Sequence, residues 1–197
     1  MILKGKTIGF GLTGSHCTFA EIMPEIQKLV DEGANVIPII SNAVQTTDTR
    51  FGPTEEWQKQ LRSITGNEII STIVDAEPIG PKGLLDVMVI APATGNSISK
   101  FANGITDSPV LMAAKAQLRN LKPVVIAVST NDGLGINGTN IGRLLAIKNI
   151  YFVPFGQDAP SKKPNSLVAR MELIKETCEE AIEHRQIQPV IVEKFKY

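Results

Sequence analysis

The chain has 197 residues, with 20 acidic and 20 basic side chains, so its formal net charge is zero. A neutral chain has no electrostatic basis for binding nucleic acid or an anionic membrane surface, and no apolar run is long enough to span a bilayer. Hydrophobic residues make up 43% of the sequence, which is enough for a buried core. We therefore expect a single domain over residues 1–197.

The N-terminal residues run directly into an apolar segment and lack the cleavage pattern of a signal peptide. Cys17 and Cys178 are far apart and form neither a disulfide framework nor a metal-binding spacing. We therefore expect a cytoplasmic protein in a reducing compartment, without a resident metal. Cys17 is expected to be a buried, inert thiol, and the alternative is a reactive thiol near a predicted helix start.

Short, nearly continuous apolar runs predict strands at residues 7–12, 36–40, 87–91, 124–128 and 150–153. Continuous rather than alternating apolar residues are typical of strands that are buried on both faces of a parallel sheet. A weaker run at residues 69–74 predicts either another strand or the end of a helix.

The spacing of apolar residues predicts helices at residues 20–32, 55–64, 110–118, 140–148 and 166–184. Thr54 is expected to cap the second of these helices, and Ser108 followed by Pro109 begins the third. Alternating strands and helices indicate an α/β fold, a Rossmann-like parallel sheet with helices on both faces in three α/β/α layers. Residues 156–165 are expected to form a long loop and residues 185–197 a C-terminal tail.

In a sheet of this kind, ligands bind beyond the carboxyl ends of the strands. The segments that follow the predicted strands are all rich in small, hydroxyl or amide residues: LTGSHC, SNAVQTTDTRFG, APATGN, STNDGLGINGTN and FGQDAPSKKPN. This edge of the sheet is therefore expected to let backbone groups approach a ligand closely.

The stretch GFGLTG at residues 9–14 fits the G-x-G-x-x-G pattern of dinucleotide-binding turns. Such sites also need Asp or Glu at the end of the second strand, where this chain has Ser41 and Asn42. The sequence therefore favours a mononucleotide phosphate site at Gly14 and Ser15, with a hydroxyl from Ser41, over NAD(P) binding. The alternative is a turn that only starts a helix.

The segments LTGS, Ser41 and APATGNSISKFANGITDSP resemble the FMN-binding flavoprotein family, which includes cysteine decarboxylases and flavin prenyltransferases. The resemblance spans roughly residues 7–155 and implies Rossmann-like subunits in trimers or multiples of trimers, with FMN at a subunit interface. It implies that FMN is held by Thr13, Gly14, Ser15, Ser41, Pro92, Ala93, Thr94, Gly95, Asn96, Ser97, Ser108 and Thr130.

Longer segments, among them GFGLTGSHCTF and STNDGLGINGTN, resemble one member of this family over the whole chain. That resemblance implies one half of a two-subunit oxidoreductase that acts on a small dicarboxylate, with NADP bound by the other half. Binding of a dicarboxylate requires cationic side chains. For each candidate cation, the alternative interpretation is an ordinary surface charge that contacts only solvent. The candidate substrate ligands are Arg50, Lys100, Arg143, Lys162 and Lys163.

Two positions depart from the family pattern. Pro78, which has no general-base chemistry, stands where the decarboxylases have a histidine, and the family's Pro-x-Met-Asn motif keeps only Asn131. Asn131 and His16 are the candidate catalytic residues, because a histidine at this edge suits proton transfer. For His16, a phosphate contact and a helix cap are the alternatives. We expect flavin-dependent oxidation rather than decarboxylation, and the alternative is an accessory protein that has lost the flavin.

Overall fold

The structure is a computed structural model that describes residues 2–193, so the last four residues of the predicted tail lie outside the described part. The strands are β1 (Thr7–Leu12), β2 (Asn35–Ile40), β3 (Val87–Ala93), β4 (Val124–Thr130), β5 (Ile150–Phe152), β6 (Phe155–Gly156) and β7 (Leu167–Ala169). The helices are α1 (Phe19–Asp31), α2 (Asn42–Thr46), α3 (Thr54–Thr65), α4 (Ile73–Ala76), α5 (Ile79–Lys82), α6 (Gly95–Ala102), α7 (Pro109–Arg119), α8 (Gly138–Leu145) and α9 (Ile174–Ile182), with short 3-10 turns at His16–Thr18 and Met171–Leu173.

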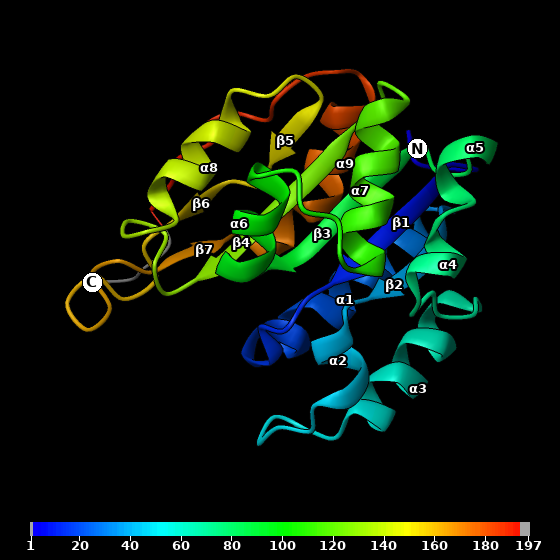
Figure 1. Cartoon of the computed structure of the whole chain (residues 1–197), viewed down its shortest axis with the longest axis horizontal. Coiled ribbons are helices and arrows are strands. Elements are labelled where there is room, and N and C mark those ends of the chain that lie inside the picture. The colour runs from blue at the N-terminus through cyan, green and yellow to red at the C-terminus, as the bar shows by residue number, and fades with distance from the viewer. Residues whose placement is uncertain (1, 194–197) are drawn as a thin grey trace.

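The sheet has the order β2-β1-β3-β4-β7-β6, and β5 also pairs with β4. Helices α1 and α9 pack on one face of the sheet, and α6 and α7 pack on the other (Figure 1). All residues of β3 are buried, as are those of β4 up to its last residue, Thr130. This burial explains why the strands read as continuous apolar runs, and it confirms the predicted Rossmann-like three-layer fold.

The sheet is parallel from β2 to β5, but β7 is antiparallel to both β4 and β6. The first half of β4 pairs with β5, whereas its last residues, Ser129 and Thr130, pair with β7. The long loop between β6 and β7, residues 157–166, projects from the body at the lower left of Figure 1. We call this segment the arm.

Three sequence predictions about local structure were wrong in part. Residues 166–184 do not form one helix, because β7 occupies the first residues and α9 begins only at Ile174. Thr54 is the first residue of α3 rather than its cap, and its N–H donates to Asp48 at 2.8 Å. The weak apolar run at residues 69–74 forms neither a full strand nor the end of a helix. Ile70 makes an isolated β-bridge with β2, and α4 begins at Ile73.

The predicted start of α7 is confirmed. The hydroxyl of Ser108 accepts a hydrogen bond from the N–H of Leu111 at 3.3 Å, and Pro109 is the first helical residue. No helix within the described residues is long and apolar enough to cross a bilayer.

Two glycines of the GFGLTG stretch lie inside β1 rather than in the turn. A Cβ atom on Gly9 would be 2.5 Å from the side chain of Leu85, and one on Gly11 would be 2.7 Å from that of Val110. Both contacts are closer than carbon atoms tolerate, so these glycines let neighbouring elements pack tightly against β1. Close packing accounts for this part of the pattern without a dinucleotide.

Single residues cover the outer edges of the sheet. The backbone N–H and C=O of Ile70 both bond to β2, at 2.9 Å each. The side-chain amide of Gln186 bonds to both the N–H and the C=O of Phe152 in β5, at 2.7 Å each. Ile191 forms an isolated bridge with Phe155 in β6.

Candidate active site at the ends of β1 and β3

The direction in which strands are added to the sheet reverses between β1 and β3, and the parallel strands follow the order 2-1-3-4-5. In doubly wound sheets, the crevice at such a switch point is the usual ligand site. Thr13 and Thr94 follow these two strands. The buried hydroxyl of Thr13 donates to the carbonyl of Pro92 at 2.6 Å and accepts from the N–H of Thr94 at 3.1 Å. This hydroxyl therefore joins the ends of β1 and β3.

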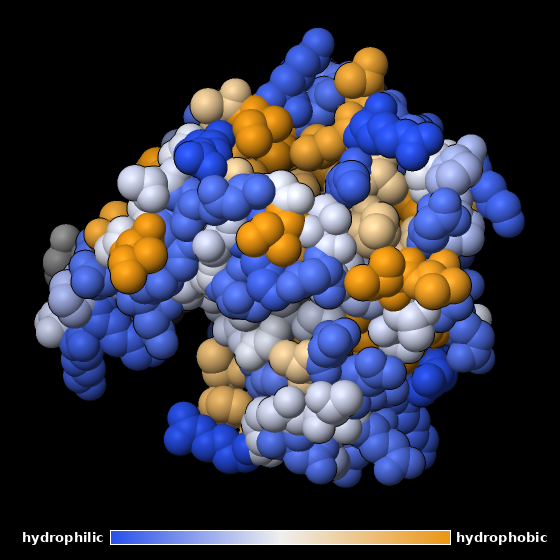
Figure 2. All heavy atoms as spheres, in the orientation of Figure 1, coloured by the Kyte–Doolittle hydropathy of each residue, from blue (hydrophilic) through white to orange (hydrophobic). Residues whose placement is uncertain are grey.

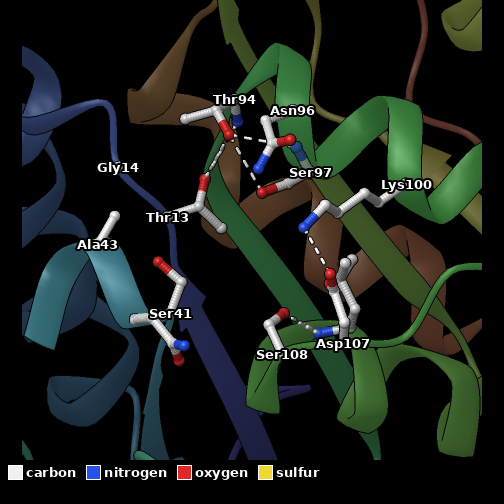
Figure 3. Close-up of a pocket in the computed structure, with 12 residues that line it drawn as sticks. Thr13, Gly14, Ser41, Ala43, Thr94, Asn96, Ser97, Lys100, Asp107 and Ser108 are labelled. Atoms are coloured by element: carbon white, nitrogen blue, oxygen red, sulfur yellow. Dashed lines mark hydrogen bonds and ion pairs between the residues drawn. The ribbon is translucent and has the colours of Figure 1, made fainter.

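A cavity of about 360 Å³ opens at this switch point. We call it the switch-point cavity. Its walls come from the turn after β1, the start of α2, the first turns of α6 and the start of α7 (Figure 3). Its lining consists of Thr13, Gly14, Ser41, Asn42, Ala43, Thr94, Asn96, Ser97, Lys100, Asp107, Ser108 and Leu111.

Helix α6 begins at the edge of this cavity because Thr94 caps it. The hydroxyl of Thr94 accepts from the N–H of Ser97 at 3.3 Å and donates to the hydroxyl of Ser97 at 3.1 Å. Gly95 follows, and a Cβ atom there would lie 2.6 Å from the Thr130 hydroxyl and 2.8 Å from an oxygen of Asp132. The glycine therefore lets the loop after β4 pack directly against the first turn of α6.

The hydroxyl of Ser41 is buried and makes no hydrogen bond to any described residue. It stands at the N-cap of α2 but does not cap that helix. Buried polar groups are nearly always paired, so an unpaired hydroxyl that lines a cavity is well placed to meet a ligand. The neighbouring wall is made of Gly14 and Ala43, and a Cβ atom on Gly14 would be 3.2 Å from that of Ala43. Small side chains thus keep this wall open to a phosphate or a flat ring.

An ion pair stands at the opposite wall. The ammonium group of Lys100 lies 2.7 Å from a carboxylate oxygen of Asp107, and the two side chains are 32% and 53% exposed. Because Asp107 neutralises Lys100, the cavity lining carries no net charge, and its hydroxyl and amide groups dominate the contacts that a ligand would meet.

The twelve residues that the family resemblance gave for FMN fall into three sets. Those that line the switch-point cavity are Thr13, Gly14, Ser41, Thr94, Asn96, Ser97 and Ser108. Pro92, Ala93 and Gly95 are buried at the end of β3 and the start of α6, next to the cavity. Ser15 and Thr130 instead line a second cavity, together with Asn131. Their proposed contacts with FMN remain predictions.

His16, a candidate catalytic residue, is buried, and its ring packs at 4.9 Å from that of Phe19. Its Nδ1 lies 3.1 Å from the carbonyl of Gly14, and because a carbonyl only accepts, Nδ1 carries the proton. Nε2 then has no hydrogen-bond partner among the described residues. The ring is not among the lining residues of either cavity in the described part of the chain. It supports the turn after β1, and its catalytic role stays a prediction.

Of the candidate substrate ligands, Lys100 lines the switch-point cavity and Lys163 lines the second one. Arg50 is exposed, with its guanidinium 4.9 Å above the ring of Phe51. Arg143 donates to the side chain of Asn103 at 2.7 Å and so links α8 to the end of α6. Their role in binding a substrate also stays a prediction.

Sequence reasoning missed several lining residues. Asn42 and Asp107 adjoin the predicted Ser41 and Ser108, so extending each predicted site by one residue would have found them. Asp158 of the second cavity lies in the segment FGQDAPSKKPN, which was expected at this edge, but it was not singled out as a site residue. Ser166 directly follows that segment, and only the pairing of β7 with β4 brings it to this edge.

The two cysteines differ from one another in exposure. The prediction of a buried Cys17 was wrong, since this side chain is exposed at the second cavity. Cys178 is buried in α9, and burial raises the pKa of its thiol. The described residues contain no group of three or more His, Cys, Asp or Glu side chains that could hold a metal ion.

Comparison with known proteins gives the family. The sequence model of the Flavoprotein family matches residues 2–190. The B subunit of dipicolinate synthase from Bacillus subtilis (strain 168) is 60% identical over 194 residues, which cover 98% of this chain and 97% of that protein.

Two solved structures extend the comparison. The crystal structure of the dipicolinate synthase B subunit from Bacillus halodurans C has a TM-score of 0.92 and 61% identity, covering 99% of this chain and 100% of that one. DmrB from Burkholderia xenovorans, solved in complex with FMN, has a TM-score of 0.62 and 19% identity, covering 75% of this chain and 87% of DmrB, and this likeness shows the fold alone. The chain therefore belongs to the flavoprotein family and, within it, to the group that contains the B subunits of dipicolinate synthase.

Proposed function

We propose that this chain is the FMN-holding component of a dipicolinate synthase. Together with the A subunit of that enzyme, which binds NADP, it oxidises dihydrodipicolinate or its hydrated precursor to pyridine-2,6-dicarboxylate during sporulation. Oxidation of the dihydro form removes a hydride and a proton and makes the ring aromatic. The observation that carries the proposal is the polar cavity at the β1/β3 switch point, in a chain whose relatives are B subunits of this enzyme.

The residues of this cavity fit FMN. The unpaired Ser41 hydroxyl, next to the small residues Gly14 and Ala43, suits the phosphate or the ribityl chain. Thr94 and Asn96 line the cavity at the start of α6, where they can bond to the ring or to the ribityl hydroxyls. The volume lies within the range of about 300–1,000 Å³ that is usual for cofactor sites. FMN, when bound, supplies the redox chemistry.

The proposal includes a homo-oligomer, a trimer or a multiple of trimers, of single-domain chains in the cytoplasm. Several residues of the cavity lining are exposed, among them Asn42, Ala43, Asn96 and Asp107. An open wall of this kind is consistent with a site that a second copy completes.

A second candidate is an accessory protein that binds and activates the A subunit without flavin. Pro78, which replaces the histidine of the decarboxylases, precedes α5, and it is not part of the described lining of the switch-point cavity. The family's Pro-x-Met-Asn motif also keeps only Asn131, which lines the second cavity instead. Both observations favour a retained fold with a lost cofactor.

The visible spectrum of the purified chain, followed by titration with FMN under fluorescence detection, separates these candidates. Asn96→Asp places a negative charge in the cavity wall. This charge repels the phosphate of FMN and should weaken FMN binding by about tenfold or more, which corresponds to ~1.4 kcal/mol or more.

The matched control is Asn103→Asp, which makes the same charge change at the end of α6 and outside the cavity lining. Stoichiometric binding that weakens in Asn96→Asp but not in Asn103→Asp supports the FMN-holding role. A complete lack of binding at high FMN concentration would exclude it and leave the accessory role.

A further inference from the structure

The second cavity has a volume of about 230 Å³ and lies where β4 ends against the arm. The chain passes from one cavity to the other within a single turn, since Gly14 lines the first and Ser15 the second. Figure 2 shows a hollow in the surface between the projecting arm and the rest of this face. We call this second space the arm cavity, and it is lined by Ser15, Cys17, Thr18, Glu21, Ser129, Thr130, Asn131, Asp158, Lys163, Ser166 and Val168.

Two polar groups of the arm are left without partners in this cavity. Ser166 is 1% exposed, and its hydroxyl makes no hydrogen bond within residues 2–193. One carboxylate oxygen of Asp158 is also buried and unbonded among the described residues. Buried polar groups without partners are rare in folded proteins, and here both occur in the lining of one cavity. They point to a ligand that supplies the missing hydrogen bonds.

The charges of the arm cavity restrict what this ligand is. The charged residues of the lining are Lys163, Asp158 and the exposed Glu21, and Lys163 is the cation among them. Its ammonium group lies 3.8 Å from the other oxygen of Asp158, too far for a hydrogen bond. On the facing side, the hydroxyls of Ser15 and Ser129 bond to each other at 2.9 Å. A ligand with a carboxylate beside an N–H group satisfies this arrangement. Its carboxylate accepts from Lys163 and Ser166, and its N–H donates to Asp158.

We propose that the arm cavity binds a cyclic amino acid or a protonated cyclic imine through its carboxylate and the adjacent ring N–H. This inference rests on the proposed function, because it places one end of a nitrogen-ring dicarboxylate next to the FMN cavity. It assigns Lys163 and Ser166 to the carboxylate and Asp158 to the ring nitrogen.

Calorimetric titration of the full-length chain tests this with two probes. Piperidine-2,6-dicarboxylate carries hydrogens on its ring nitrogen, whereas pyridine-2,6-dicarboxylate has none. Lys163→Ala should weaken both probes about tenfold or more, since a charge-assisted hydrogen bond is lost. Lys59→Ala, an exposed lysine of α3 outside both cavity linings, should change neither. Asp158→Asn should weaken the piperidine probe and leave the pyridine probe unchanged or tighter.

Ser166→Ala separates a binding role from a structural one. Removing a buried hydroxyl that has no protein partner should leave the melting temperature unchanged or raise it, while the affinity for both probes falls several-fold. Ser161→Ala, in the exposed part of the arm, is the matched control.

Binding that is insensitive to Lys163→Ala, or no binding of either probe at millimolar concentration, would overturn the inference. FMN affinity measured on the same variants keeps the two proposals apart. In the unaltered chain, FMN binding without probe binding refutes only the arm cavity, and probe binding without FMN binding refutes only the flavin site. In the variants of the arm, weaker probe binding with unchanged FMN affinity is the expected result.

Discussion

Thr13→Val tests whether the hydroxyl of Thr13 holds the switch point together. Valine keeps the shape of threonine but leaves the Pro92 carbonyl and the Thr94 N–H without their partner at 2.6 and 3.1 Å. An unpaired buried group costs ~1–3 kcal/mol, so the buried carbonyl and the partly buried N–H together should cost about 2–4 kcal/mol of unfolding free energy. A typical domain has about 5–15 kcal/mol, and the variant should therefore fold.

Urea unfolding measures this loss as a lower midpoint with an unchanged slope. The control is Thr46→Val, which removes an exposed hydroxyl that donates to Asn42 within α2 and should change the unfolding free energy by less than about 0.5 kcal/mol. A loss below about 1 kcal/mol for Thr13→Val, or equal losses in the two variants, would refute the reasoning. Because both walls of the cavity shift when the strand ends part, FMN affinity should fall as well.

Three further measurements check other parts of the structure. Gly95→Ala should lower the melting temperature, because its Cβ atom would lie within 2.8 Å of three polar side chains. The control Gly142→Ala in α8 adds a Cβ atom that meets no atom within 4 Å, and it should stabilise the fold by up to about 1 kcal/mol. Equal effects of the two substitutions on the melting temperature would contradict the packing argument. An aromatic disulfide reagent should modify Cys17 rapidly and Cys178 only after unfolding, and rapid reaction of both thiols would show that α9 opens readily. Because burial raises the pKa of Cys178 above its ordinary 9.0, this thiol ionises first in the unfolded chain. Its contribution to the free energy of unfolding is therefore intact below pH 9.0 and falls above pH 9.0 by about 1.4 kcal/mol per pH unit. Urea unfolding at a series of pH values measures this slope, which should be absent from Cys178→Ala.

The strands of the parallel sheet and helix α7 were predictable because their signals are local. A buried parallel strand needs an unbroken apolar run, and β1 has the same bounds as the predicted run at residues 7–12. For α7, Ser108 and Pro109 suit the N-cap and the first helical position, wherever the helix packs. Signals of this kind do not depend on the rest of the fold.

The prediction of one helix over residues 166–184 was wrong because β7 depends on distant residues. Only a few residues form this strand, and it exists because Ser129 and Thr130 at the end of β4 offer a free edge. The sequence from Leu167 onwards has no turn residue that would separate a strand from the following helix. The helical periodicity alone therefore placed the start of the predicted helix at residue 166, before the observed start of α9 at Ile174.

The sequence predicted which edge of the sheet holds the site, but it did not predict that this edge carries two separate cavities. The rule that ligands bind at the carboxyl ends of parallel strands brought Thr13, Ser41 and Thr94 together, and these residues line one cavity. Which way a side chain points after the strand is set by the turn geometry. Gly14 and Ser15 are adjacent in sequence yet face different cavities, and the residue types alone do not reveal this.

The single residues that cover β2, β5 and β6 bear on how copies of this chain meet. Ile70, Gln186 and the two neighbours of Ile191, Val190 and Val192, occupy hydrogen-bonding positions that a foreign strand would need in order to extend the sheet. Residues that cover an edge strand in this way protect against edge-to-edge polymerisation, although they do not add a whole strand to the sheet. In the proposed homo-oligomer, contacts between copies would therefore be made by helices and loops, which include the open wall of the switch-point cavity. Replacing the Gln186 amide with an apolar side chain would expose the Phe152 backbone and promote aggregation through the edge of the sheet.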